Sequence, residues 1–139
     1  MREGSAEVSG KAVPCANCGV KHRSLTSEEC QDRQMSEETL RSRVTDRAKR
    51  RKWVVAHAGR GQVGAAGFWV TPMFKGWPDL FLMNPDHVPP VIAIELKREL
   101  GDLEPEQLDC LDLLNRCGIP AVVVRPSDLR LHRVNAILS

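Results

Sequence analysis

Long apolar runs are missing from this sequence of 139 residues. No run exceeds about four residues, whereas a helix that spans a bilayer needs roughly 20. Residues 1–13 carry no apolar core of the kind that a secretory signal requires. The five cysteines are an odd number, and without an export signal they argue against a disulfide framework. We therefore expect a soluble, intracellular protein with reduced thiols.

The sequence also has little excess of acidic or basic residues, since the formal net charge is +2. Its composition of 42% hydrophobic and 27% charged residues is that of a globular protein. A shift in composition near residue 35 divides the chain. We expect a flexible tail over 1–14, a cysteine-rich segment and linker over 15–35, and one folded domain over 36–139.

The folded domain has the pattern of a mixed α/β protein. The order of predicted elements is one helix, three strands, a helix, a strand and a last helix, with a flexible loop at 59–67 and a short strand at 68–70. Strands joined by short turns should pair antiparallel, and the strand after the long helix should return parallel. The helices are predicted at 37–51, 105–117 and 126–138, and the strands at 53–58, 79–83, 91–97 and 121–125.

An acid and a base share one face of the predicted strand 91–97. Side chains alternate along a strand, so Glu95 and Lys97 point away from the apolar Ile92, Ile94 and Leu96. The preceding strand begins at Asp79, directly after Gly and Pro. Two carboxylates about 4 Å apart repel by about 4 kcal/mol at an effective dielectric constant of 20, so such a pair requires a cation.

The chemistry of this group is that of phosphodiester hydrolysis. Carboxylate oxygens at a partly hydrated site suit Mg²⁺ or Mn²⁺ better than zinc. Lys97 beside the metal ion can orient a water molecule and stabilise charge on a phosphate. Glu37 shares its helical stripe with Leu40 and Val44, and Gln107 shares one with Leu111 and Leu114, so both should point inward towards a common polar site. Each also has a plain structural alternative, as a first-turn acid and as a backbone-bonded amide.

The residues resemble a known family. The order Gly76-x-Pro78-Asp79-Leu80, Glu95-Leu96-Lys97, Gln107 and Arg125-Pro126-Ser127-Asp128, with Ser36-Glu37 before it, is similar to virus-type replication–repair (VRR-NUC) nucleases of the PD-(D/E)XK superfamily. The resemblance covers about residues 36–138. It implies a restriction-endonuclease-like αβββαβ core and a Mg²⁺- or Mn²⁺-dependent endonuclease.

In this resemblance each site residue receives a role. Asp79 and Glu95 are metal ligands together with the carbonyl of Leu96, Lys97 is the catalytic lysine, and Glu37 and Gln107 support the site. The family implies cleavage of branched, flap or junction DNA in phage or bacterial replication, repair or recombination, and it allows a homodimer. A cytoplasmic location in a bacterial or phage-infected cell follows. Two alternatives stay open, a non-catalytic DNA-binding protein on a nuclease-like scaffold and a nuclease that acts on RNA or without regard to structure.

The positive charge is concentrated in one segment. Residues 41–60 hold eight Lys or Arg and one acid, a net charge of +7. A charge run alone is typical of a solvated helix face, but beside a nuclease site it favours contact with phosphates. The candidate DNA-binding residues are Arg41, Arg47, Arg50, Arg51, Arg60 and Lys75.

The cysteines of the N-terminal segment have metal-ligand spacing. Four candidate zinc ligands occur within sixteen residues, Cys15, Cys18, His22 and Cys30. Bound zinc would order a segment too small to bury a core, and reduced thiols on a disordered tail are the alternative. Cys110 and Cys117 lie on the predicted long helix among leucines, so we expect both to pack in the core.

Overall fold

The central element is a sheet of four strands in the order β1-β4-β5-β6. A computed structural model of the chain describes residues 14–15, 18–19, 25–57, 61–63, 68–70 and 75–139. Strand β1 pairs antiparallel with β4, and β4 pairs antiparallel with β5, whereas β6 runs parallel to β5. The mixed sheet expected from the sequence is confirmed. Its strands are β1 (Val54–His57), β4 (Leu80–Met83), β5 (Val91–Leu96) and β6 (Ala121–Val124).

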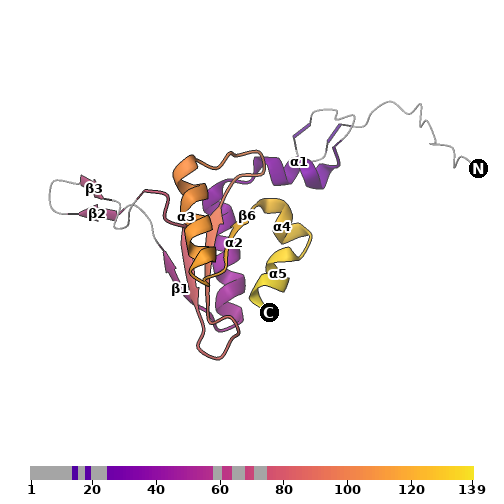
Figure 1. Cartoon of the computed structure of the whole chain (residues 1–139). Coiled ribbons are helices and arrows are strands. Elements are labelled where there is room, and N and C mark those ends of the chain that lie inside the picture. The colour runs from indigo at the N-terminus through magenta and orange to yellow at the C-terminus, as the bar shows by residue number, and fades with distance from the viewer. Residues whose placement is uncertain (1–13, 16–17, 20–24, 58–60, 64–67, 71–74) are drawn as a thin grey trace, which may run out of the picture.

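Helices cover both faces of this sheet (Figure 1). Helices α2 (Glu37–Arg50), α4 (Pro126–Arg130) and α5 (Arg133–Leu138) pack on one face, and α3 (Pro105–Arg116) packs on the other. The predicted stripe of α2 is confirmed, because Leu40, Val44 and Ala48 are completely buried. Burial of a side chain such as Leu or Val stabilises the fold by about 1.5–3 kcal/mol.

Strand β5 shows how the side-chain alternation divides the molecule. Ile92, Ile94 and Leu96 belong to the larger core, which α2, α4 and α5 complete. Ala93 belongs to the smaller core under α3. Glu95 lies on the same side of the strand as Ala93, which is the side predicted from the period of two.

The N-terminal segment contains a helix that the sequence analysis did not predict. Helix α1 spans Ser27–Gln34, and Thr26 and Glu29 form a capping box at its start. Thr26 Oγ1 accepts a hydrogen bond from the Glu29 amide at 3.1 Å, and Glu29 Oε2 accepts one from the Thr26 amide at 2.9 Å. The predicted tail over 1–14 lies outside the described residues except for Pro14.

Two predictions about secondary structure are wrong. The single C-terminal helix expected over 126–138 is divided into α4 and α5, because His132 adopts a left-handed conformation with φ of 59°. The loop expected over 59–67 contains strand β2 (Gly61–Val63), which pairs antiparallel with β3 (Phe68–Val70) in a separate two-stranded sheet. Neither difference changes the central sheet. Within the described ranges, no helix has both the length and the apolar character needed to cross a bilayer.

Candidate active site

Asp79 lies at the entrance of β4 and is fixed by the neighbouring strand. Its Oδ2 accepts a hydrogen bond from the backbone N–H of Leu96 at 2.8 Å. The antiparallel register pairs Leu80 with Ile94, so the next position along places Asp79 opposite Glu95. The turn before β4 and the end of β5 therefore bring two carboxyl groups together, as the sequence predicts.

Glu95 is a buried acid with only 2% of its surface exposed. Its Oε1 accepts a hydrogen bond from Gln107 Nε2 at 2.8 Å. Its Oε2 is buried and has no hydrogen-bond partner among the residues that the structure describes. Burial, and then the negative charge of Asp79, raise the pKa of Glu95 from 4.5 to about 8, while the positive charge of Lys97 acts in the opposite direction.

Gln107 connects this acid to the first turn of α3. Its Oε1 accepts a hydrogen bond from the amide of Glu104, the N-cap residue, at 2.9 Å, and its amide nitrogen donates to Glu95. Both polar ends of the side chain are therefore satisfied, and its orientation is fixed. The inward direction predicted for Gln107 is found in the structure.

Glu37 and Lys97 lie within electrostatic range of the same carboxyl group. The charge of Glu37 adds to the increase in the pKa of Glu95, and the charge of Lys97 opposes it. Glu37 is the first residue of α2, and Lys97 follows the last residue of β5. The backbone N–H of Lys97 donates to the carbonyl of Val124 at 3.1 Å, which fixes the chain there. Two helices, one strand and one turn thus contribute to a single group of polar side chains.

Gly76 allows the turn before β4 to lie against α3. Its φ is +91°, and a Cβ atom at this position would collide with the backbone carbonyl of Glu106. Only glycine fits both the backbone conformation and this close approach. Because Glu106 precedes Gln107, the contact also fixes the turn that carries Gln107.

The basic residues predicted to bind DNA lie at different distances from the carboxylates. Arg41 Nη2 lies 3.7 Å from Asp79 Oδ1, so this residue is at the acidic group. Lys75 forms an exposed ion pair with Glu106 at 3.2 Å, near Gly76. Arg47 instead donates to the carbonyl of Leu129 and to Asn135. The exposed Arg50 and Arg51 lie at the other end of α2, about 13 Å along the axis from Arg41, and Arg60 lies outside the described residues.

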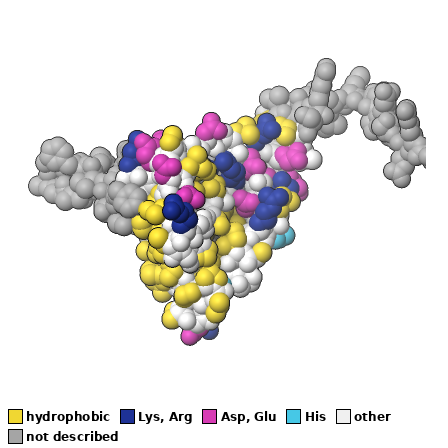
Figure 2. Space-filling model, in the orientation of Figure 1, with side chains coloured by type: hydrophobic (Ala, Val, Ile, Leu, Met, Phe, Trp, Pro, Cys, Tyr) yellow, Lys and Arg dark blue, Asp and Glu magenta, His cyan; other side chains and the backbone are white. Residues whose placement is uncertain are grey.

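Charged groups of both signs are concentrated on one part of the face that Figure 2 shows. Figure 2 shows them over the upper part of the visible face, whereas hydrophobic side chains dominate the lower part. The upper part is where α1 and the beginning of α3 lie in Figure 1. A surface of mixed sign can place cations beside an acidic centre, which a polyanionic ligand requires.

The carboxylates of this group fit a hard divalent cation. Two carboxyl groups close together, one of them with an unsatisfied buried oxygen, form an oxygen donor set of the kind that Mg²⁺ or Mn²⁺ takes. A cation there would also offset the burial and the negative charge of Asp79, which together raise the pKa of Glu95. Asp79 and Glu95 are therefore the residues suited to hold such an ion.

A second group of ligand atoms lies in the N-terminal segment. The sulfur atoms of Cys15, Cys18 and Cys30 are within 4.8 Å of one another, an arrangement that suits a metal ion such as zinc. His22, the fourth predicted ligand, lies outside the described residues. On α3, Cys110 is buried as predicted, whereas Cys117 is exposed, so its predicted place in the core is wrong. Burial, and then the charge of Glu95, raise the pKa of the Cys110 thiol.

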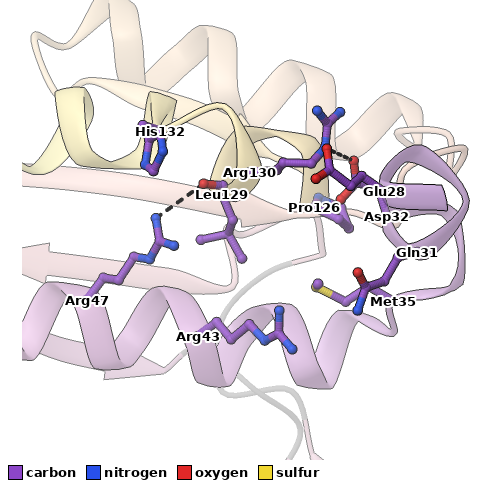
Figure 3. Close-up of a pocket in the computed structure, with 10 residues that line it drawn as sticks. All are labelled: Glu28, Gln31, Asp32, Met35, Arg43, Arg47, Pro126, Leu129, Arg130 and His132. Carbon is purple, nitrogen blue, oxygen red and sulfur yellow. Dashed lines mark hydrogen bonds and ion pairs between the residues drawn. The ribbon is translucent and has the colours of Figure 1, made fainter. Parts of the chain in front are cut away.

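A pocket of about 300 Å³ lies between α1, α2 and α4 (Figure 3). The ion pair between Asp32 and Arg130 and the hydrogen bond from Arg47 to Leu129 cross it. Neither Asp79 nor Glu95 lines this pocket. It is therefore separate from the carboxylate group.

Sequence reasoning missed the residues that hold the loop after Lys97. Arg125 Nη1 donates to the carbonyls of Arg98 and Gly101, both at 2.7 Å, and the Ser127 amide donates to Glu99 Oε2 at 3.0 Å. The motif at 125–128 was noted only as part of the resemblance. The side chain of Arg125 binds carbonyl groups that lie 24 to 27 residues earlier in the chain. The spacing of apolar residues cannot predict such a contact.

The comparisons with known proteins give one family match. Residues 70–128 match the family model of the VRR-NUC domain. No curated protein and no solved structure matches the chain. The matched segment includes Asp79, Glu95, Lys97 and Gln107, and a domain of this type implies a nuclease-type function in DNA processing. Over residues 70–128 the chain is therefore similar to the VRR-NUC domain family.

Proposed function

We propose that the protein is a Mg²⁺- or Mn²⁺-dependent endonuclease that hydrolyses phosphodiester bonds of DNA. The observation that carries this proposal is the buried Glu95, whose unsatisfied Oε2 lies in a site shared with Asp79 and Lys97. The ionised form of a buried acid with a pKa of about 8 is unfavourable near neutral pH unless a cation lies close to the carboxylate. The VRR-NUC match over the same residues supports the nuclease chemistry.

Each side chain has a defined task in this proposal. Asp79 and Glu95, with the carbonyl of Leu96, hold the divalent ion, which supplies Lewis acidity toward a phosphate oxygen and lowers the pKa of bound water. The Lys97 ammonium group orients the attacking water molecule and stabilises the charge that develops on the phosphate. Gln107 keeps the Glu95 carboxylate in place through its hydrogen bond. Glu37 adds a further acceptor at the edge of the site.

Arg41 is the cation best placed to bind the DNA backbone at this site. Its guanidinium group lies within 3.7 Å of Asp79, so a phosphate that approaches the carboxylates also approaches Arg41. Lys75 lies close to the turn before β4 and could extend the contact along the strand. Arg50 and Arg51 would hold phosphates further along α2.

The substrate class that we propose is branched, flap or junction DNA, in phage or bacterial replication, repair or recombination, with a homodimer as the assembly. The resemblance of the motifs to VRR-NUC nucleases supports this assignment. The half-buried Arg41 near one end of α2 and the exposed Arg50 and Arg51 at the other end are compatible with a substrate that contacts the protein at more than one place.

The test is cleavage of labelled duplex, flap and four-way-junction DNA, and of labelled RNA, with and without added Mg²⁺ or Mn²⁺. The variants are Lys97→Ala and Asp79→Asn, and the control is Arg116→Ala, which removes an exposed cation from the last turn of α3. We expect cleavage that requires the metal, at least about a 100-fold loss in both site variants, and no loss in the control.

The outcomes separate the alternatives. Preferential cleavage of one branched substrate would support the structural selectivity, and equal cleavage of all of them, or cleavage of RNA, would contradict it. Cleavage that both site variants retain would contradict the assigned site. Tight binding of DNA without cleavage of any substrate would favour the non-catalytic DNA-binding protein.

A further inference from the structure

Three cysteine sulfur atoms converge at the start of the described chain. Cys15 and Cys30 are buried, with 8% and 4% of their surface exposed, and the sulfur atoms of Cys18 and Cys30 are 3.4 Å apart. This separation is much longer than the roughly 2.05 Å of a disulfide, and the cysteines are not disulfide-bonded. The Gly19 amide donates to the Cys15 carbonyl at 2.8 Å, so the residue after Cys18 lies close to Cys15.

The spacing of these atoms matches a metal-thiolate site. Zinc–sulfur bonds are about 2.3 Å long, which places the sulfur atoms of a tetrahedral site about 3.8 Å apart. The three sulfur atoms lie within 4.8 Å of one another, so small adjustments bring them to one ion. Thiolates are soft ligands that select zinc over the hard cations suited to carboxylates. The two groups of ligands in this chain therefore differ in the metal that they favour.

Helix α1 lacks the apolar packing that stabilises a short helix. Its two buried residues are Cys30 and Asp32. An isolated helix of eight residues is unstable in water, and tertiary contacts supply most helical stability in proteins. Here Cys30 contacts the thiol of Cys18 and Asp32 forms an ion pair with Arg130 of α4, so contacts of these two residues take the place of an apolar face.

Asp32 attaches this helix to the rest of the fold. Its Oδ2 accepts from Arg130 Nε at 2.7 Å, and the carboxyl side chain is only 7% exposed (Figure 3). The same end of α1 also reaches the loop after Lys97, because Arg98 Nη2 donates to the carbonyl of Arg33 at 3.4 Å. Arg98 directly follows Lys97. An ordered α1 therefore contacts the segment that leaves β5 beside the carboxylates.

We propose that Cys15, Cys18 and Cys30 bind one structural zinc ion that holds α1 against α4 and against the loop at 98–101. The three thiols lose their protons on binding, and each sulfur forms a bond to the metal. The ion takes no part in the chemistry at Asp79 and Glu95. Its effect on that site is mechanical, through the position of α1.

The first experiment measures the metal content of the full chain and of three variants, Cys15→Ser, Cys18→Ser and Cys30→Ser. Cys117→Ser is the matched control, because Cys117 is exposed at the end of α3. We expect about one zinc per chain in the unaltered protein and in the control, and less than a tenth of this in each of the other variants. Replacement by Co²⁺ should produce thiolate-to-metal charge-transfer absorption. Absent zinc, cobalt without this absorption, or full zinc content in Cys30→Ser would overturn the proposal.

The second experiment uses the unaltered protein, so a folding defect of a variant cannot explain the result. Zinc is removed with a chelator, Mg²⁺ is restored, and hydrogen exchange is measured before and after zinc is added back. We expect exchange in the zinc-free protein to be at least tenfold faster in residues 27–34 and faster in 98–101, with no change in β4 and β5. Equal exchange in α1 with and without zinc would overturn the structural role. Neither experiment depends on DNA cleavage.

Discussion

At the scale of single residues, the state of Glu95 determines what the site can bind. A carboxyl group that is buried beside Asp79 keeps its proton until the solution is mildly alkaline, because its pKa is raised to about 8. A divalent ion and a proton therefore compete for the same oxygen atoms. The amide of Gln107 is neutral and can donate to Glu95 in either state.

This competition leads to a prediction for stability. A raised pKa in the folded state means that the folded protein holds a proton that the unfolded chain releases above pH 4.5. In chelator-treated protein the contribution of Glu95 is fully present below pH 4.5 and is lost as the pH rises to about 8. The free energy of unfolding should fall in this window by up to about 1.4 kcal/mol per pH unit.

Urea unfolding of the unaltered protein and of Glu95→Gln across this pH range measures the effect. The amide does not titrate, so the variant should lose less stability between pH 4.5 and 8 than the unaltered chain. Saturating Mg²⁺ should restore more stability at pH 8 than at pH 5. Two parallel curves would show that Glu95 does not hold its proton in the folded state.

At the scale of elements, the position of α3 depends on its contact with the turn before β4. Gly76→Ala would place a methyl group against the Glu106 carbonyl in a backbone conformation that alanine disfavours. Gly118→Ala is the matched control, because Gly118 also has a positive φ, of 83°, but has open space around it.

We expect the control substitution to lower the free energy of unfolding by about 1–2 kcal/mol, from backbone strain alone. Gly76→Ala should lower it by at least about 2 kcal/mol more, because the first turn of α3 must move. DNA cleavage by the proposed enzyme should decrease only in Gly76→Ala, since Gln107 moves with that turn. Equal thermal stability of the two variants would refute the close contact.

The elements were predicted well where a pattern of apolar residues defines them. The stripe Leu40, Val44 and Ala48 and the alternation of β5 are strong signals, and the central sheet followed from them. Helix α1 has no apolar stripe, so its segment was interpreted from the cysteines alone. The capping box of Thr26 and Glu29, which indicates a helix, was overlooked. The break between α4 and α5 at His132 involves no glycine or proline, so the sequence did not indicate it.

At the scale of the whole molecule, the site combines residues that are far apart in the chain. Glu37, Asp79, Glu95, Lys97 and Gln107 were each predicted to point towards a common place, and the structure brings them together. Periodicity indicates direction but not partners. Three arginine contacts depend on tertiary packing that periodicity does not describe. They are the ion pair of Arg41 with Asp79, the hydrogen bond from Arg47 to Leu129 and the hydrogen bond from Arg125 to Gly101.

The distribution of charge over the molecule leads to a prediction for DNA binding. If Arg50 contacts a phosphate, Arg50→Ser should weaken binding of all DNA sequences to a similar extent. It should also reduce the slope of log K against log[salt] by about 0.9 for duplex DNA. Arg47→Gln should change this slope little, because Arg47 already donates to Leu129 and Asn135.

Fluorescence anisotropy in Ca²⁺, which does not usually support phosphodiester cleavage at Mg²⁺ sites, measures binding over a range of salt concentrations. Arg116→Ser serves as the control, since its exposed ion pair with Asp112 lies within α3, away from α2. An unchanged slope for Arg50→Ser would remove this end of α2 from the DNA interface.

The hydrogen bond from the Leu96 amide to Asp79 gives the protein an internal spectroscopic reporter. A backbone amide that donates to a carboxylate has a proton chemical shift that follows the charge of that carboxylate. The next amide along the chain, that of Lys97, donates to a backbone carbonyl and is a reference directly after the strand. In a proton–nitrogen-15 correlation spectrum, the chemical shift of the Leu96 amide would therefore follow protonation or metal ligation of Asp79. The chemical shift of the Lys97 amide should change much less.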